Sequence, residues 1–184
     1  KNRVKLNEID INLGKTPLKY FTDFIQREIL PAIQANVKED VLGRFYGEFV
    51  KYSGGDGKGL GIVLTPTHIT ELMCDLVNLK PQDIVFDPCA GTAGFLISAM
   101  HYMLEQEKDE KNKEKIKKEQ LHGVEIREDL YTIATTNMIL RGDGKSNLRR
   151  ADFINSDIGQ FKQIQATVGL MNPPYSQAKT EDTL

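Results

Sequence analysis

The chain has 184 residues and a net charge of −2, and 40% of its residues are hydrophobic. This composition excludes a wholly disordered chain and a globally basic surface, although a local basic patch for nucleic acid stays open. No apolar run reaches the roughly 20 residues of a membrane-spanning helix. Two cysteines without metal or redox spacing favour a reducing, cytoplasmic setting. The length allows one domain and an extension.

The first 55 residues predict a helical extension. Thr16 and Pro17 are the residue types of an N-cap and a first helical position, and apolar residues follow at helical spacing. Pro31 is expected to kink or end this helix. A second amphipathic helix is predicted over residues 40–52. Such a layer either packs on the main domain or binds a partner, and the sequence alone favours neither.

A glycine-rich run at residues 53–61 is expected to connect this extension to a core domain at residues 56–184. The run lacks the spacing of a phosphate-binding P-loop. Thr65 and Pro66 then predict an N-cap and the first position of another helix. The N-terminus of that helix could also hold a carboxylate.

The stretch at residues 83–100 predicts a strand, a glycine loop and a helix. An apolar run rich in β-forming residues ends at Asp87, a turn of small residues runs to Gly94, and apolar residues recur at helical spacing from Phe95. In an open α/β sheet, such a loop places backbone N–H groups and the positive end of a helix where nucleotide-like cofactors bind. The alternative is an ordinary turn between a strand and a helix.

The rest of the chain alternates strands with helices. Mixed charges at residues 105–120 predict a solvated helix end or an exposed loop. Further strands are predicted at 121–126, 148–151 and 166–171, with a helix after the first and a short helix capped by Asp157 before the last. This alternation predicts an α/β fold with a parallel sheet and right-handed crossovers.

A polar side chain follows each predicted strand: Asp87, Glu125, Asp152 and Asn172. Each alone could cap a loop, but together they are expected to converge at one carboxyl edge. An acid after the second strand can accept hydrogen bonds from both ribose hydroxyls, and one after the third can accept from an adenine amino group. Because the dinucleotide pattern Gly-x-Gly-x-x-Gly is absent, an adenosine with an amino-acid tail fits better than NAD or FAD.

The sequence Asn-Pro-Pro-Tyr at residues 172–175 predicts chemistry at a planar amino group. The prolines rigidify the backbone, so the Asn172 side-chain oxygen and the Pro173 carbonyl can both accept from one amine. Tyr175 offers a ring face for stacking. Two acceptors on the hydrogens of a conjugated amine favour charge build-up on its nitrogen as it attacks. The alternative is a rigid turn with a buried tyrosine.

The chain resembles the modification (M) subunit of type I restriction-modification systems, a DNA N6-adenine methyltransferase. The resemblance covers roughly residues 40–184, and its motifs are residues 59–66, 87–95, 123–126 and 172–175, in an order similar to the gamma arrangement of amino-methyltransferases. It implies a Rossmann-like methyltransferase fold, with the parallel sheet truncated after about four strands and the extension belonging to the family's N-terminal domain. It also implies S-adenosyl-L-methionine as cofactor.

The resemblance implies partners and site residues as well. The partners are DNA, a specificity subunit and a second M subunit, and a restriction (nuclease) subunit stays open. The implied catalytic residues are Asn172, Pro173, Pro174 and Tyr175. The expected cofactor-binding residues are Thr65, Pro66, Asp87, Gly91, Thr92, Ala93, Gly94, Phe95, Glu125, Asp152, Phe153 and Asn172. No metal site and no membrane association are expected.

The glycine loop departs from the usual family sequence, Asp-Pro-Ala-Cys-Gly-Thr-Gly-Gly-Phe. Cys89 and Ala90 are exchanged, and Ala93 replaces a glycine. Ala93 is tolerable if its φ is negative, whereas a positive φ would be strained.

Two other functions stay open. The same tetrapeptide occurs in enzymes that methylate RNA adenine or protein glutamine, although the Thr-Pro element and the Asp-Pro loop favour DNA. A non-catalytic scaffold fragment that contacts partner subunits is the other alternative. The chain starts at Lys1 and leaves little room after the last predicted strand, so we expect it to be part of a longer protein and to be inactive alone.

Overall fold

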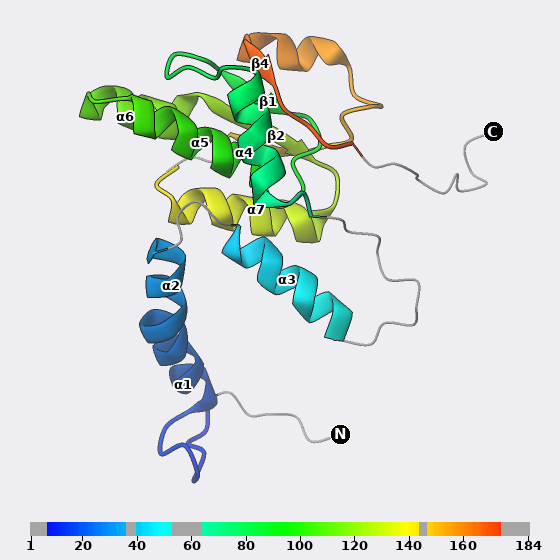
Figure 1. Cartoon of the computed structure of the whole chain (residues 1–184). Coiled ribbons are helices and arrows are strands. Elements are labelled where there is room, and N and C mark those ends of the chain that lie inside the picture. The colour runs from blue at the N-terminus through cyan, green and yellow to red at the C-terminus, as the bar shows by residue number, and fades with distance from the viewer. Residues whose placement is uncertain (1–6, 36–39, 53–63, 144–146, 174–184) are drawn as a thin grey trace, which may run out of the picture. The chain divides into compact units, whose positions relative to one another are not determined.

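A computed structural model describes residues 7–35, 40–52, 64–143 and 147–173 (Figure 1). The chain divides into two compact units, Lys1–Val37 and Lys38–Leu184. This division falls before the predicted boundary at residue 55, because helix α3 (Val41–Tyr52) packs against α7 (Glu128–Leu140) within the second unit. The predicted glycine connector lies outside the described residues.

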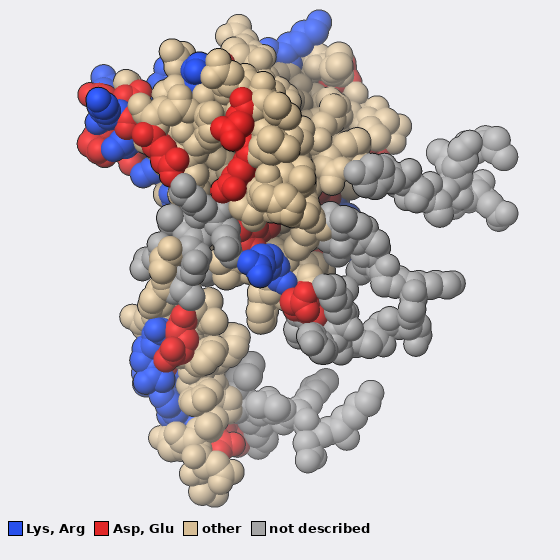
Figure 2. Space-filling view, viewed as in Figure 1, with Lys and Arg blue, Asp and Glu red and all other residues tan. Residues whose placement is uncertain are grey.

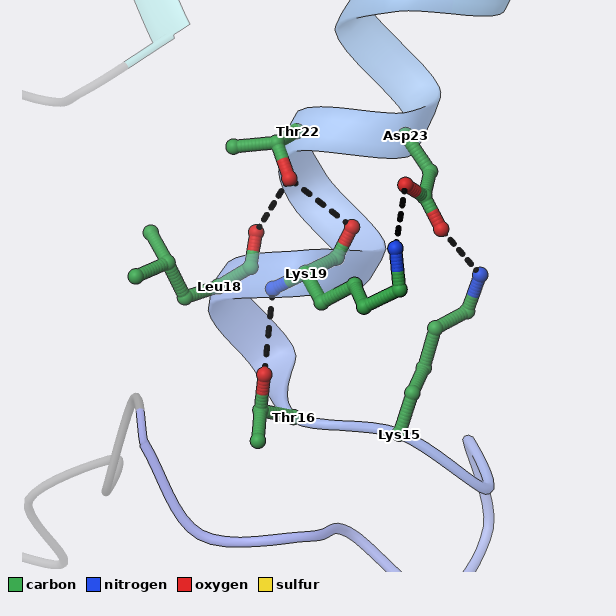
Figure 3. A network of polar contacts seen from close by, with 6 residues as sticks. All are labelled: Lys15, Thr16, Leu18, Lys19, Thr22 and Asp23. Atoms are coloured by element: carbon green, nitrogen blue, oxygen red, sulfur yellow. Dashed lines mark hydrogen bonds and ion pairs between the residues drawn. The ribbon is translucent and has the colours of Figure 1, made fainter.

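The first unit is a helical run made of α1 (Pro17–Phe24), a π-helical segment η1 (Ile25–Ile29) and α2 (Leu30–Ala35). Thr16 caps α1 as predicted, because its side-chain oxygen accepts from the Lys19 N–H at 3.2 Å. Asp23 accepts from the Nζ atoms of Lys15 and Lys19 at 2.8 and 3.3 Å (Figure 3).

Pro31 does not end this helical run. The Leu30 N–H bonds to the Ile25 carbonyl, five residues back, so the helix widens just before the proline. A proline has no N–H to donate to the preceding turn, and π-helical segments are one way in which helices accommodate such an irregularity. The run continues through Ala35.

The second unit contains a parallel sheet of four strands, which confirms the predicted sheet. The strands are β1 (Val85–Asp87), β2 (Leu121–Glu125), β3 (Leu148–Arg150) and β4 (Val168–Gly169), in the order β3-β2-β1-β4. Val85 pairs with Leu121 on one side and with Val168 on the other. The chain therefore moves outward from β1 to β3 and then crosses to the other side of β1. Ligands bind at such reversals of strand order, beyond the carboxyl ends of the strands.

The core lies between this sheet and α5 (Gly94–Gln106), which packs against α4 (Thr67–Leu76) and against β1 and β2. Leu96, Met100 and Met103 of α5 are buried, and Leu121 of β2 joins the same cluster. The helix after β1 is therefore apolar over most of its surface, and its N-terminus is held at the carboxyl edge of the sheet.

Residues 110–119 form a separate helix, α6 (Glu110–Glu119), where the sequence predicted a helix end or a loop. Asp109 caps it by accepting from the Asn112 N–H at 3.0 Å, and Ile116 is its buried residue. Charges of both signs cover α6, as predicted (Figure 2).

A 3₁₀ helix, η2 (Ile158–Ile164), precedes β4. Asp157 caps it as predicted, because its side chain accepts from the Gly159 N–H at 2.9 Å. None of the described helices is both long enough and apolar enough to cross a membrane.

Candidate active site

A cavity of about 540 Å³ opens at the carboxyl ends of the strands. This volume lies in the range typical of small-ligand sites. The structure brings ten of the predicted site residues together in its lining: Thr65, Gly91, Thr92, Gly94, Phe95, Glu125, Asp152, Phe153, Asn172 and Pro173. Pro66, Asp87 and Ala93 are not among the lining residues, and Pro174 and Tyr175 lie outside the described residues.

Glu125 links the end of β2 to the glycine loop. The residue is only 8% exposed. One carboxylate oxygen accepts from the Gly91 N–H at 2.8 Å, and the other accepts from the Arg127 N–H at 2.8 Å. Because each carboxylate oxygen can accept more than one hydrogen bond, Glu125 retains capacity for a ligand hydroxyl.

The glycine loop is strained at Ala93. Its φ is +73°, in the left-handed region. An alanine in place of the family's glycine would be tolerable here only with a negative φ, so the substitution is a strained one. For a residue with a Cβ, this conformation costs about 1–2 kcal/mol. Gly91 has a φ of +55°, which glycine adopts without that cost. The Ala90 N–H bonds to the Val124 carbonyl at 2.8 Å, which holds the loop against β2.

Asp87 lies at the end of β1 as predicted, but it is fully buried beneath the loop instead of in the cavity lining. One carboxylate oxygen accepts from the Cys89 N–H at 3.0 Å, which turns the side chain under its own loop, and the other is buried without a hydrogen-bond partner. Burial, together with the nearby Glu125 charge, raises the pKa of Asp87 to about 7, although the hydrogen bond from the Cys89 N–H acts in the opposite direction.

Asp152 lines the cavity and also organises its own turn. One carboxylate oxygen accepts from the N–H groups of Ile154 and Asn155 at 3.1 Å each, and the other accepts from Asn155 Nδ2 at 2.7 Å. These hydrogen bonds lower the pKa of Asp152, so it carries its charge at neutral pH. The Phe153 ring packs against the Phe161 ring, with centroids 5.2 Å apart.

Thr65 does not cap helix α4, contrary to the prediction. The helix begins at Thr67, and the Pro66 carbonyl accepts the first helical hydrogen bond from the Ile69 N–H at 2.9 Å. The Thr65 hydroxyl instead accepts from Asn172 Nδ2 at 3.0 Å. This contact joins the segment after β4 to the residues that precede α4.

Sequence reasoning did not single out several lining residues. The most informative is Asp40, which the prediction had placed in the extension and whose side chain bonds to Asn137 Nδ2 at 2.7 Å. An aspartate directly before a helical pattern was the signal that could have identified it as an N-cap, although not as a cavity residue. The other lining residues not predicted include Leu64, Ile126, Arg127, Leu130 and Asn155. Among the described residues, no group of three or more His, Cys, Asp or Glu side chains could hold a metal ion.

Comparisons with known proteins agree with this geometry. A family model described as N-6 DNA Methylase matches residues 37–184, a range that begins one residue before the second compact unit. The chain is 52% identical over 180 residues to the type II restriction enzyme and methyltransferase RM.BcgI of Heyndrickxia coagulans, covering 98% of the chain and 28% of that protein. It is 30% identical over 142 residues to the type I restriction enzyme MjaIX methylase subunit of Methanocaldococcus jannaschii, covering 77% of the chain and 24% of the subunit.

A solved structure supports the fold. The modification subunit of a putative type I restriction enzyme from Vibrio vulnificus YJ016 superposes with a TM-score of 0.63 at 21% identity. The superposition covers 76% of the chain and 29% of that subunit. The chain thus spans less than a third of the length of these relatives.

Proposed function

The chain belongs to the N-6 DNA methylase family, and from this premise we propose that its second unit binds S-adenosylmethionine and takes part in methylating the N6 amine of adenine in DNA. The observation that supports this most directly is one cavity lined both by the glycine loop and by the Asn172–Pro173 segment. A cofactor side and a substrate side of one reaction would therefore share a single space.

Glu125 is the residue we assign to the ribose of the cofactor. It lies at the end of β2 and is already oriented by two backbone N–H groups, so a hydroxyl would meet a fixed carboxylate. Asp152 and Phe153 line the same cavity beyond β3 and would contact the adenine ring. When bound, the cofactor supplies a methyl group activated by a positively charged sulfur.

Asn172 is the residue we assign to the target amine. Its amide nitrogen donates to the Thr65 hydroxyl at 3.0 Å, which holds the side chain at the cavity, and we assign to its oxygen the role of acceptor for an amine of the substrate. The Pro173 carbonyl would be the second acceptor and Tyr175 the stacking ring. Since a base inside a duplex is out of reach, the target adenine would have to flip out of the helix.

The partners follow from the relatives. We expect a restriction-modification complex in which a specificity subunit selects the DNA sequence. A second arrangement is favoured by the relative named both restriction enzyme and methyltransferase, because its 52% identity covers 98% of the chain. In that arrangement, one protein would carry both restriction and modification.

The test is single-turnover methyl transfer from labelled S-adenosylmethionine to duplex DNA by the full-length protein with its partner subunits, with RNA and a glutamine peptide as competing substrates. Asn172→Ala should lower the rate by about 10²–10³, by analogy with the loss of one oxyanion-hole donor, and should affect cofactor affinity less than the chemical step. Thr65→Val should lower the rate less, because it removes the Thr65 contact but keeps the Asn172 amide. Wild-type rates in Asn172→Ala would refute the catalytic assignment, and preferential labelling of RNA or peptide would refute the DNA substrate.

A further inference from the structure

Asp40 joins three segments that are distant in sequence. One carboxylate oxygen accepts from the Gly43 N–H at 2.7 Å, which caps helix α3, and from Asn137 Nδ2 at 2.7 Å in α7. The other carboxylate oxygen accepts from the hydroxyl of Thr92 in the glycine loop. A single side chain therefore links α3, α7 and the loop that lines the cavity.

A second layer of hydrogen bonds supports this link. Asn137 is fully buried, and its Nδ2 also donates to the Thr92 carbonyl at 2.9 Å. Arg141 donates to the Asn137 carbonyl and to its side-chain oxygen at 2.9 and 3.1 Å, which fixes the orientation of the amide. Both the hydroxyl and the backbone of Thr92 are thus held by residues from outside the loop.

Helix α3 approaches the loop closely at Gly43. A Cβ atom at this position would lie 2.7 Å from the Thr92 hydroxyl oxygen and would also collide with the Asp40 carboxylate. Cβ atoms essentially never make contacts this short, so the side chains would have to move apart. Glycine at position 43 therefore lets the first turn of α3 approach the glycine loop without displacing Asp40 or Thr92.

The loop needs restraint from outside because its own backbone is strained. Ala93 has a left-handed φ directly after Thr92, and such conformations persist only where the surroundings hold them. Glu125 restrains the loop at Gly91, and Asp40 restrains it one residue later, at Thr92. With both contacts in place, the loop is already formed before a ligand enters.

We propose that Asp40 is a positioning residue of the cofactor site, which acts through Thr92 to hold the glycine loop in its binding conformation. This proposal deepens the proposed function and rests on cofactor binding in this cavity. Helix α3 is then part of the cofactor site through its first turn. A separate tie of α3 to the unit, from the Tyr46 hydroxyl to Asp129 at 2.6 Å, lies at residues outside the cavity lining.

Four variants of the full-length protein separate these roles. Asp40→Ser keeps an N-cap for α3 but is too short to hold Thr92 and Asn137 as well. Asp40→Asn keeps the length of the side chain and can bond to all three partners if the Thr92 hydroxyl accepts instead of donating. Gly43→Ala forces Asp40 away from Thr92. Tyr46→Phe is the matched control, because it loosens α3 without touching the loop.

Two measurements test the proposal: calorimetry with S-adenosylmethionine, and amide hydrogen exchange of residues 88–95 without cofactor. Asp40→Ser and Gly43→Ala should weaken binding about tenfold, equivalent to about 1.4 kcal/mol, and speed exchange in the loop. Asp40→Asn should recover most of this loss, and Tyr46→Phe should stay within about twofold of the wild type.

Unchanged affinity and unchanged exchange in Asp40→Ser would overturn the proposal. A loss in Tyr46→Phe as large as in Asp40→Ser would also overturn it, because the packing of α3 in general would then set the affinity. If the wild-type protein itself does not bind S-adenosylmethionine, the proposed function fails. The exchange measurement then decides alone: faster exchange in Asp40→Ser upholds the positioning role, and equal exchange overturns it.

Discussion

Replacing Glu125 with alanine should damage both the stability of the glycine loop and the binding of the cofactor. The side chain is nearly buried and accepts from the Gly91 and Arg127 N–H groups at 2.8 Å each. Each buried donor left without a partner costs about 1–3 kcal/mol. Because water from the cavity can reach this position, we take the lower end for both and expect the free energy of unfolding to fall by about 2 kcal/mol.

The binding loss is a separate quantity. If the carboxylate accepts from ribose hydroxyls, its removal should weaken S-adenosylmethionine binding by a further 1–3 kcal/mol or so, which is roughly 5- to 150-fold in Kd. Glu125→Gln is the matched control. The glutamine has the same length but one acceptor oxygen, so it can serve only one of the two backbone groups and should be intermediate in both measurements.

Chemical denaturation gives the stability change, and calorimetry under conditions where each variant is fully folded gives the affinity. An affinity in Glu125→Ala equal to that of the wild type would refute the ribose assignment, even if stability fell as expected. Equal stability would refute the reading of Glu125 as the link between β2 and the glycine loop.

Three further predictions follow from the structure. Ala93→Gly should change the free energy of unfolding by less than about 1 kcal/mol, because relief of the left-handed strain offsets the lost methyl group. The control Ala99→Gly, in the interior of α5, should lower the free energy of unfolding by about 1–2 kcal/mol. Equal losses for the two variants in urea denaturation would contradict the strain at Ala93. Between about pH 4 and 7 the folded state keeps a proton on Asp87 that the unfolded state has released, so the free energy of unfolding should fall as pH rises through this window and level off above about 7. From pH 5 to 8 this decrease should amount to at most about 3 kcal/mol, and Asp87→Asn should abolish it; an unchanged slope in that variant would contradict the assignment. Deleting residues 1–37 should spare cofactor binding and impair assembly of the complex, since α1 has no buried residue and exposes Leu18, Phe21 and Phe24. Loss of cofactor binding in a folded protein, or intact assembly by size-exclusion chromatography, would contradict a role of this unit in assembly.

The sequence alone was enough to predict the parallel sheet and the strand, loop and helix around residues 83–100. The reason is that these signals are local: an apolar run, a cluster of small residues and a helical period lie next to one another in the chain. Parallel strands place their carboxyl ends at one edge, so the positions of Glu125, Asp152 and Asn172 around one space followed from the order of the elements.

Only the tertiary structure decided which partner each side chain takes. Thr65 has the residue type of a helix cap, but packing brings it to Asn172, 107 positions away. Asp40 does cap α3, yet its second partner is Thr92, 52 positions later. The sign of φ at Ala93 was likewise undetermined, because it depends on how the loop closes between β1 and α5. Local periodicity indicates the type and order of the elements, whereas long-range hydrogen bonds depend on distances that exist only once the elements have packed.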